Sequence, residues 1–206
     1  PSSVRRARSC GATAHSWSFG NNSEGIDIVS SQVWWFVSRS SGIIAWALVS
    51  LSVAWGLFIS TKAVAKASSP AWLLDLHRYL GGLSVAFTAV HLIGLWADSY
   101  VEFGWAEMFV PLSTEWKPWP VAFGIVALYL LIAVEATSLM MSHLPRRWWR
   151  AVHHLSLPLY VMATYHGIVA GTDHGNTAFR LAALASVNVI AFLAVVLILA
   201  SRRSAF

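Results

Sequence analysis

The sequence predicts an all-α membrane protein, a bundle of about five transmembrane helices within residues 31–203. Of its 206 residues, 57% are hydrophobic and only 11% are charged, whereas about one quarter of the residues of a soluble domain are charged. Several apolar stretches are each close to the ~20 residues that a helix needs to cross a bilayer. Many of the twelve Trp residues lie at the ends of these stretches, as in an interfacial aromatic belt.

The elements are expected in the following order. Residues 1–30 are rich in Ser, Gly, Asn and Arg and lack a helical apolar period, which predicts an N-terminal tail outside the membrane domain. The apolar stretches run over residues 33–60, 72–97, 119–142, 149–171 and 177–201. The connection between the second and third stretches contains several prolines and aromatic residues, so we expect it to fold over one face of the bundle rather than cross the membrane.

The distribution of charge predicts the orientation in the membrane. The first and third connections and the C-terminal tail are basic and should be cytoplasmic, since Lys and Arg accumulate on that side. Their basic residues are Lys62, Lys66, Arg146, Arg147, Arg150, Arg202 and Arg203. The N-terminus and the mainly acidic second connection should then lie outside. This topology accounts for the net charge of +5, so nucleic-acid binding is not expected.

Two histidines lie within the second stretch, and an ionisable residue inside a span indicates a functional site. His77 and His91 lie fourteen residues apart in LHRYLGGLSVAFTAVHL. Fourteen steps return to within about 40° of the same helix face and separate the side chains by about 21 Å along the axis. One face of this helix therefore presents an imidazole at two depths.

The fourth stretch carries His153 and His154 at its expected cytoplasmic end and His166 near its outer end. Two crossings separate the second and fourth stretches, so they run parallel, and their histidines lie at matched depths. On an ideal helix, however, His166 is about 140° from His153 and about 120° from His154. Pro158 lies between them, and we predict a kink there that brings the outer half of the helix into line.

Histidines paired at two depths predict that the bundle encloses two stacked b-type hemes. Two neutral imidazoles per iron leave no open coordination position, which favours electron transfer over oxygen binding. Cys10 is the only cysteine, so the chain has no CxxCH motif for covalent heme attachment. The expected iron ligands are His77, His91, His166 and either His153 or His154. The other explanation is that these histidines make ordinary polar contacts in a heme-free transport subunit.

Three further ionisable residues are of interest. Arg39, at the outer end of the first span, and Arg78, beside His77, could bind heme propionates or simply anchor their helices at the interface. Glu135 is the acid of the third span and could exchange protons with a quinone or bond to a neighbouring helix.

Glycines near the expected ligands would allow either a porphyrin or another helix to approach closely. These are Gly81, Gly82, Gly94 and Gly167.

Four segments carry a resemblance to a known family: LHRYLGG and VHL in the second span, PRRWWRAVHHLS at the start of the fourth, and YHGIVAGTD at its end. Over about residues 33–200 the chain resembles the ferric reductase-like transmembrane domain family. That family includes the heme-binding core of NADPH oxidases, ferric reductases and the heme subunit of a bacterial methionine sulfoxide reductase system. The resemblance implies that His77 and His153 hold an inner heme and that His91 and His166 hold an outer one. It selects His153 because the first histidine of the family's double-histidine motif is the ligand.

The resemblance also implies a function and a location, a bacterial plasma membrane. Electrons would pass from a cytoplasmic flavin reductase or quinol through both hemes to an outer redox partner or ferric iron. Because no GxGxxG motif is present, we expect the electron-transfer subunit of an oxidoreductase rather than a complete enzyme. Two alternatives remain: a quinol-oxidising cytochrome b that anchors a respiratory complex, with Glu135 in its quinone pocket, and a heme-free structural or transport subunit.

Overall fold

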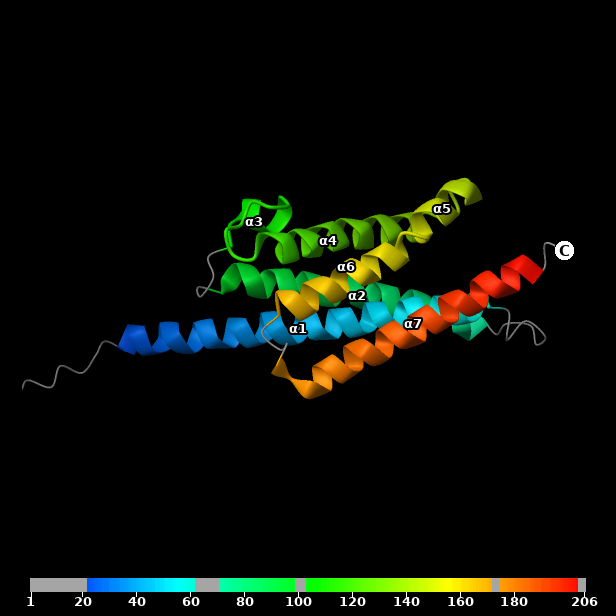
Figure 1. Ribbon diagram of the computed structural model, residues 1–206. Helices are drawn as coiled ribbons and strands as arrows, with labels where there is room; N and C mark the ends of the chain where they lie inside the picture. The colour runs from blue at the N-terminus through cyan, green and yellow to red at the C-terminus, as the bar shows by residue number, and fades with distance from the viewer. Residues whose placement is uncertain (1–21, 62–70, 99–102, 172–174, 204–206) are drawn as a thin grey trace, which may run out of the picture.

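The computed structural model describes residues 22–61, 71–98, 103–171 and 175–203, with side chains from residue 32 onward (Figure 1). The helices are α1 (Asn22–Ser60), α2 (Ala71–Ala97), α3 (Trp105–Phe109), α4 (Pro118–Leu139), α5 (Arg146–His153), α6 (Ser156–Val169) and α7 (Thr177–Arg203). The described residues contain no strand, so the all-α prediction is confirmed. α1 starts at Asn22, before the apolar run predicted from residue 33, and residues 1–21 of the expected tail lie outside the described residues.

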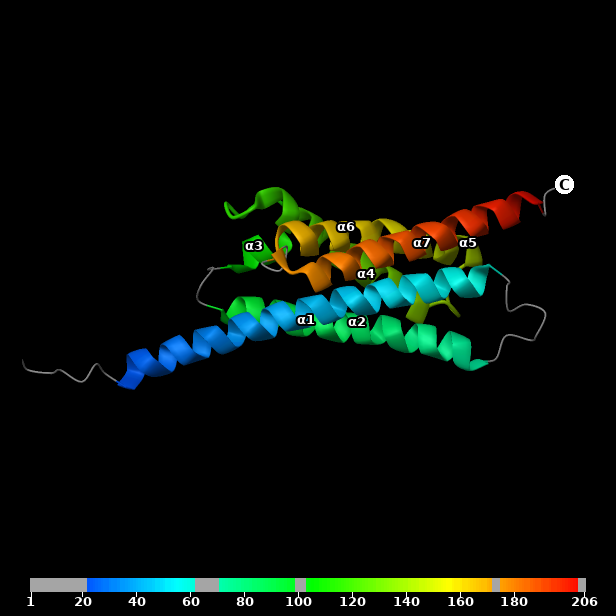
Figure 2. The same ribbon diagram turned by 60° about the horizontal axis from the view of Figure 1, so that its bottom comes forward.

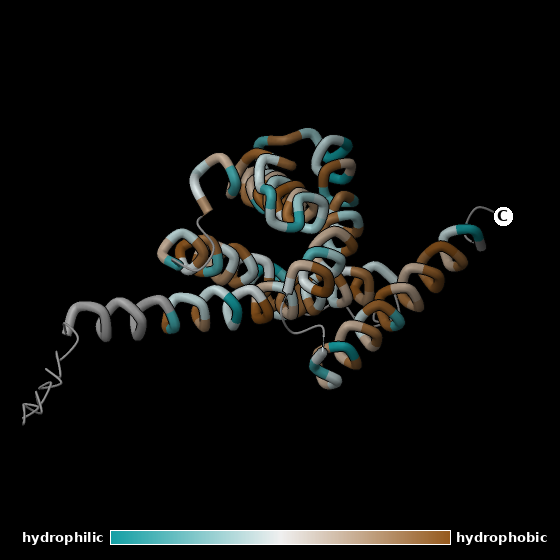
Figure 3. Tube along the Cα trace, turned by 60° about the vertical axis from the view of Figure 1, so that its left-hand side comes forward, coloured by the Kyte–Doolittle hydropathy of each residue, from teal (hydrophilic) through white to brown (hydrophobic). Residues whose placement is uncertain are grey.

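Four of the described helices are long and apolar enough to cross a membrane. They cover Gln32–Ser60, Ala71–Ala97, Pro118–Leu139 and Thr177–Arg202. Large apolar side chains face outward, among them Leu139, 85% exposed, and Phe192, 67% exposed. Figure 3 shows apolar residues along most of α7, with hydrophilic residues near the marked C-terminus. Such an outer surface is stable in lipid and not in water, so the chain is an integral membrane protein.

The fourth predicted span is two helices rather than one. α5 ends at His153 and α6 begins at Ser156, and residues 154–155 form a turn between them. Pro158 is therefore the third residue of α6, within a first turn where the missing proline N–H costs little. The kink predicted at Pro158 was placed too late: the break lies at residues 154–155. α6 has only 14 residues and is too short to be counted with the four long helices.

The packing is dominated by two helix pairs. α1 and α2 are antiparallel and share the most extensive contact, and α4 packs on α6 (Figures 1 and 2). The core between the pairs consists of apolar side chains, namely Val49, Val53, Ala127, Leu131, Leu159, Tyr160 and Ile190. Trp46 of α1 donates a hydrogen bond from Nε1 to Thr164 Oγ1 of α6 at 3.0 Å, which joins the two pairs.

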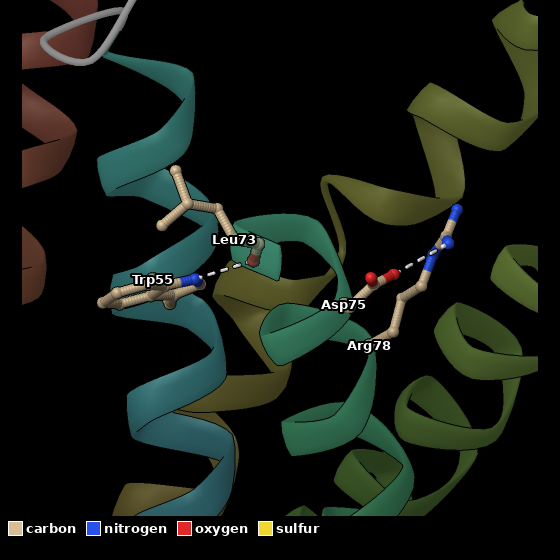
Figure 4. Close-up of polar contacts among 4 residues, drawn as sticks. All are labelled: Trp55, Leu73, Asp75 and Arg78. Atoms are coloured by element: carbon tan, nitrogen blue, oxygen red, sulfur yellow. Dashed lines mark hydrogen bonds and ion pairs between the residues drawn. The ribbon is translucent and has the colours of Figure 1, made fainter. Parts of the chain in front are cut away.

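α3 and α5 lie at opposite ends of the bundle, which we call the α3 end and the α5 end (Figure 1). At the α5 end, Trp55 of α1 donates from Nε1 to the Leu73 carbonyl at 2.9 Å and fastens the start of α2 (Figure 4). At the α3 end, the segment before α4 packs Phe103 and Met108 against Val121. Its described part thus lies over the end of the bundle, as the sequence predicts for the second connection.

Candidate functional site

Four predicted ligands form two pairs inside the bundle. His77 of α2 faces His153 of α5, with ring centroids 5.9 Å apart and ring planes at 77°. His91 of α2 faces His166 of α6, with centroids 6.4 Å apart and planes at 75°. We call His77 and His153 the first pair, toward the α5 end, and His91 and His166 the second pair, toward the α3 end.

The break between α5 and α6 explains how one chain segment serves both pairs. α2 presents its two histidines from one face because they are fourteen residues apart. On an uninterrupted helix, His153 and His166 would point in different directions. The turn at residues 154–155 lets both rings face α2. His153 is half-buried and stacks on Trp149, with centroids 5.0 Å apart, whereas His154 is exposed. His154 also lines the cavity of the first pair, but the ring that faces His77 belongs to His153.

Each pair lines its own cavity. The first cavity contains His77, His153 and Glu135, and the second contains His91 and His166. Three aliphatic residues line both cavities and thus form the partition between them: Val49 of α1, Leu131 of α4 and Leu159 of α6. All three belong to the buried core. The two sites are therefore stacked along the bundle and separated by a single layer of apolar side chains.

Three of the four rings donate a hydrogen bond from Nδ1 to the backbone of a neighbouring helix. His91 Nδ1 lies 2.7 Å from the Ser38 carbonyl, and His166 Nδ1 lies 2.9 Å from the Pro120 carbonyl. His77 bonds to the backbone of Ser52, whose hydroxyl oxygen lies 3.4 Å from Nδ1. Because a carbonyl can only accept, Nδ1 carries the proton and Nε2 keeps its lone pair for a metal.

Glycines that the sequence did not single out lie against the same three rings. A Cβ atom on Gly42 would lie 2.9 Å from His91 Nδ1, and one on Gly124 would lie 2.6 Å from His166 Nδ1. One on Gly56 would lie 3.1 Å from His77 Cε1. These distances are shorter than ordinary van der Waals contact, so each ring occupies the space of a missing side chain. The signal was available, since Gly42 and Gly56 repeat the fourteen-residue step of the α2 histidines.

The glycines that the sequence did single out have other surroundings. A Cβ on Gly94 would meet the Ser38 backbone nitrogen at 2.8 Å, so Gly94 serves close packing of α1 and α2. Gly81 lies against the Glu135 carboxylate, where a Cβ would overlap it. Gly82 has no atom within 4 Å of such a Cβ, and Gly167 has only the edge of Phe179 at 3.9 Å.

The two predicted arginines differ in position. Arg39 lines the second cavity, and its guanidinium carbon lies 4.8 Å from the ring centroid of Trp35. Arg78 is exposed, pairs with Asp75 of its own helix at 3.5 Å and is not among the residues that line the first cavity (Figure 4). Adjacent helical residues point about 100° apart, which is why Arg78 faces away from the site of His77.

The remaining histidines lie elsewhere. His143 is exposed in the turn before α5, and His15 and His174 lie outside the described residues. Within the described residues, no cluster of three or more His, Cys, Asp or Glu side chains could hold a metal ion. A pair of histidines is the arrangement that suits a cofactor which supplies its own equatorial ligands.

The family model of the ferric reductase like transmembrane component matches residues 41–164, more than half of the chain. This protein belongs to the ferric reductase-like transmembrane family. The matched range of this ferric reductase-like chain contains His77, His91 and His153, and His166 follows two residues after its end. No curated protein and no solved structure matches the chain. The family predicted from the sequence is thus confirmed.

Proposed function

We propose that this ferric reductase-like chain carries electrons across the membrane through two b-type hemes, one at each histidine pair. The spacing of the rings carries the proposal. Metal–nitrogen bonds of about 2 Å on each side, and about 1.1 Å from each ring centre to its nitrogen, put the ring centres about 6 Å apart. The observed 5.9 Å and 6.4 Å suit one iron ion between the rings of each pair.

The surroundings of the rings support the same ligands. His77, His91 and His166 have Nδ1 engaged by backbone, which directs Nε2 away from the supporting helix. Arg39 on the wall of the second cavity suits a heme propionate. Arg78 would reach a propionate only by exchanging Asp75, and that exchange is easy because an exposed pair is worth less than about 1 kcal/mol. When bound, heme supplies the one-electron chemistry.

The direction of transfer follows from the charges at the two ends. The α5 end carries Arg146, Arg147 and Arg150, which favours the cytoplasmic side, and the α3 end carries Asp98 and Glu107. The first pair then receives electrons from a cytoplasmic flavin reductase or quinol, and the second delivers them to an outer redox partner or ferric iron. Glu135 in the first cavity favours quinol as the donor and keeps a quinol-oxidising cytochrome b as the second candidate.

The test is a dithionite-reduced minus oxidised absorption spectrum of the purified protein, together with its heme content. We expect the α-band of a b-type cytochrome and two hemes per chain. His91→Ala and His166→Ala should each lose one heme, the same one, while His143→Ala in the exposed turn should keep both. A colourless protein would overturn the proposal and leave the heme-free subunit as the explanation. Two hemes retained in both His91→Ala and His166→Ala would overturn the assignment of one heme to each histidine pair.

A further inference from the structure

We infer that Gly42, Gly56 and Gly124 are positioning residues that hold three of the four histidines by exposing a backbone carbonyl four residues earlier in the helix. This inference rests on the proposed function, since the glycines act through the ligands, and all three glycines also line the cavities of the histidine pairs. It adds a role for α1, a helix that supplies no ligand.

The same arrangement occurs three times. His91 lies against Gly42 and bonds to the carbonyl of Ser38. His166 lies against Gly124 and bonds to the carbonyl of Pro120. The third case is His77, which lies against Gly56 and bonds to the backbone of Ser52. In every case the acceptor precedes the glycine by four residues, so a single geometric rule describes all three.

The geometry of an α-helix explains the rule. The carbonyl of residue i−4 accepts the N–H of residue i and keeps a second lone pair. A side chain at residue i covers the turn that precedes it and therefore shields that lone pair. Glycine leaves it uncovered, so an imidazole from the neighbouring helix can enter and donate its Nδ1–H. The bond fixes the tautomer and the orientation of the ring and makes Nε2 a stronger donor to a metal.

The repeat on α1 argues against accidental packing. Gly42 and Gly56 are fourteen residues apart, as are His77 and His91 on the antiparallel α2, so two copies of one contact are in register. Glycine costs a helix about 1 kcal/mol relative to alanine, so helix stability alone would favour alanine at both positions. Gly82, with open space around it, shows that a helical glycine need not make such a contact.

The fourth ligand breaks the pattern and makes the two sites unequal. His153 Nδ1 is buried without a hydrogen-bond partner among the described residues, and its ring stacks on Trp149 instead. Both rings of the second pair are thus held by carbonyls, whereas the first pair has one such ring. A substitution at Gly42 or Gly124 should therefore affect one heme, and a substitution at Gly56 should affect the other.

The experiment is a redox titration of both hemes, followed by absorption and by low-spin EPR, in four single variants. Gly42→Ala and Gly124→Ala should change the same titration step, raising its midpoint potential because the imidazole becomes a weaker donor to ferric iron, or lowering heme affinity about 10- to 100-fold. Gly56→Ala should change the other step. Gly82→Ala is the matched control and should titrate as the wild type.

Ser38→Ala separates the two parts of the contact to His91. It removes the hydroxyl, 3.4 Å from Nδ1, and keeps the carbonyl at 2.7 Å, so its effect on the titration should be clearly smaller than that of Gly42→Ala. If Gly42→Ala fails to fold, Gly124→Ala tests the same pair from the opposite helix. The inference is wrong if Gly42→Ala and Gly124→Ala change different steps or neither, or if Ser38→Ala reproduces Gly42→Ala. Those results leave the proposed function intact, whereas a wild-type protein without heme refutes the function itself.

Discussion

His153 differs from the other three proposed ligands in what surrounds its ring. Its Nδ1 has no hydrogen-bond partner in the described chain, and an exposed second histidine follows it directly. Packing against Trp149, rather than a hydrogen bond, sets its orientation. A ligand held in this way depends on apolar contacts, so the first pair is the less rigidly defined of the two.

Our first prediction distinguishes the adjacent histidines. His153→Ala should reduce the heme content from two per chain to one, because His153 is the ring that faces His77. His154→Ala should retain both hemes, because His154 is exposed and makes no ring contact with His77 in this structure. A pyridine hemochrome assay measures the content, and loss of heme in His154→Ala with retention in His153→Ala would reverse the ligand assignment.

The second prediction concerns Glu135, the carboxylate that lines the first cavity against Gly81. Glu135→Gln keeps the size of the side chain and removes its ability to accept a proton. If a quinol is the donor, its reduction of the protein should slow about 100-fold, the usual contribution of a general base. Stopped-flow absorption measures the rate, while heme content and reduction by dithionite should stay unchanged.

Ser138→Ala is the matched control for Glu135→Gln. Its hydroxyl lies on the same helix and bonds to the Val134 carbonyl at 2.7 Å, away from the cavity lining. It should be reduced by quinol as fast as the wild type. Equal quinol rates in Glu135→Gln and the wild type would exclude Glu135 from the donor reaction and favour a flavin reductase as donor.

At the level of elements, the break between α5 and α6 matters more for the alignment of His166 than Pro158, at which the sequence predicts a kink. The third prediction follows: Pro158→Ala should keep both hemes and change the free energy of unfolding by less than about 1 kcal/mol, because Pro158 lies in the first turn of α6. Ala163→Pro, in the middle of the same helix, should cost about 3 kcal/mol or more and misalign His166. Heme content and thermal unfolding in detergent measure both effects, and heme loss in Pro158→Ala would show that the proline itself sets the direction of α6.

The sequence predicts the depth of each histidine in the membrane, but not the direction in which every ring points around its helix axis. Depth depends only on the rise per residue, so His77 could be matched with His153 and His91 with His166 before the fold was known. The phase of His166 depends on the turn at residues 154–155, which no glycine marks and which lies before Pro158. The fourteen-residue step from Gly42 to Gly56 is visible in the sequence, but the roles proposed for these glycines and for Gly124 also require the register between helices, which local periodicity does not contain.

For the molecule as a whole, the difference in charge between the ends predicts orientation. Exposed basic residues concentrate at the α5 end, and the mainly acidic second connection lies at the α3 end. The fourth prediction uses single cysteines in a Cys10→Ser background: Pro111→Cys, exposed at the α3 end, should react with a membrane-impermeant maleimide on intact cells. His143→Cys, exposed at the α5 end, should react only after the cells are opened. The reverse labelling would invert the proposed direction of transfer.

The partition of Val49, Leu131 and Leu159 has a consequence for the energetics of the cell. An electron can tunnel through a single layer of saturated side chains, but a proton or metal ion needs water or a continuous line of polar groups. None of these three side chains carries a polar group, so they give a proton or metal ion no partner, whereas an electron could pass them between the proposed hemes. If the proposed hemes are bound, electrons would cross this partition without opening a path for the ions whose gradients drive other transport.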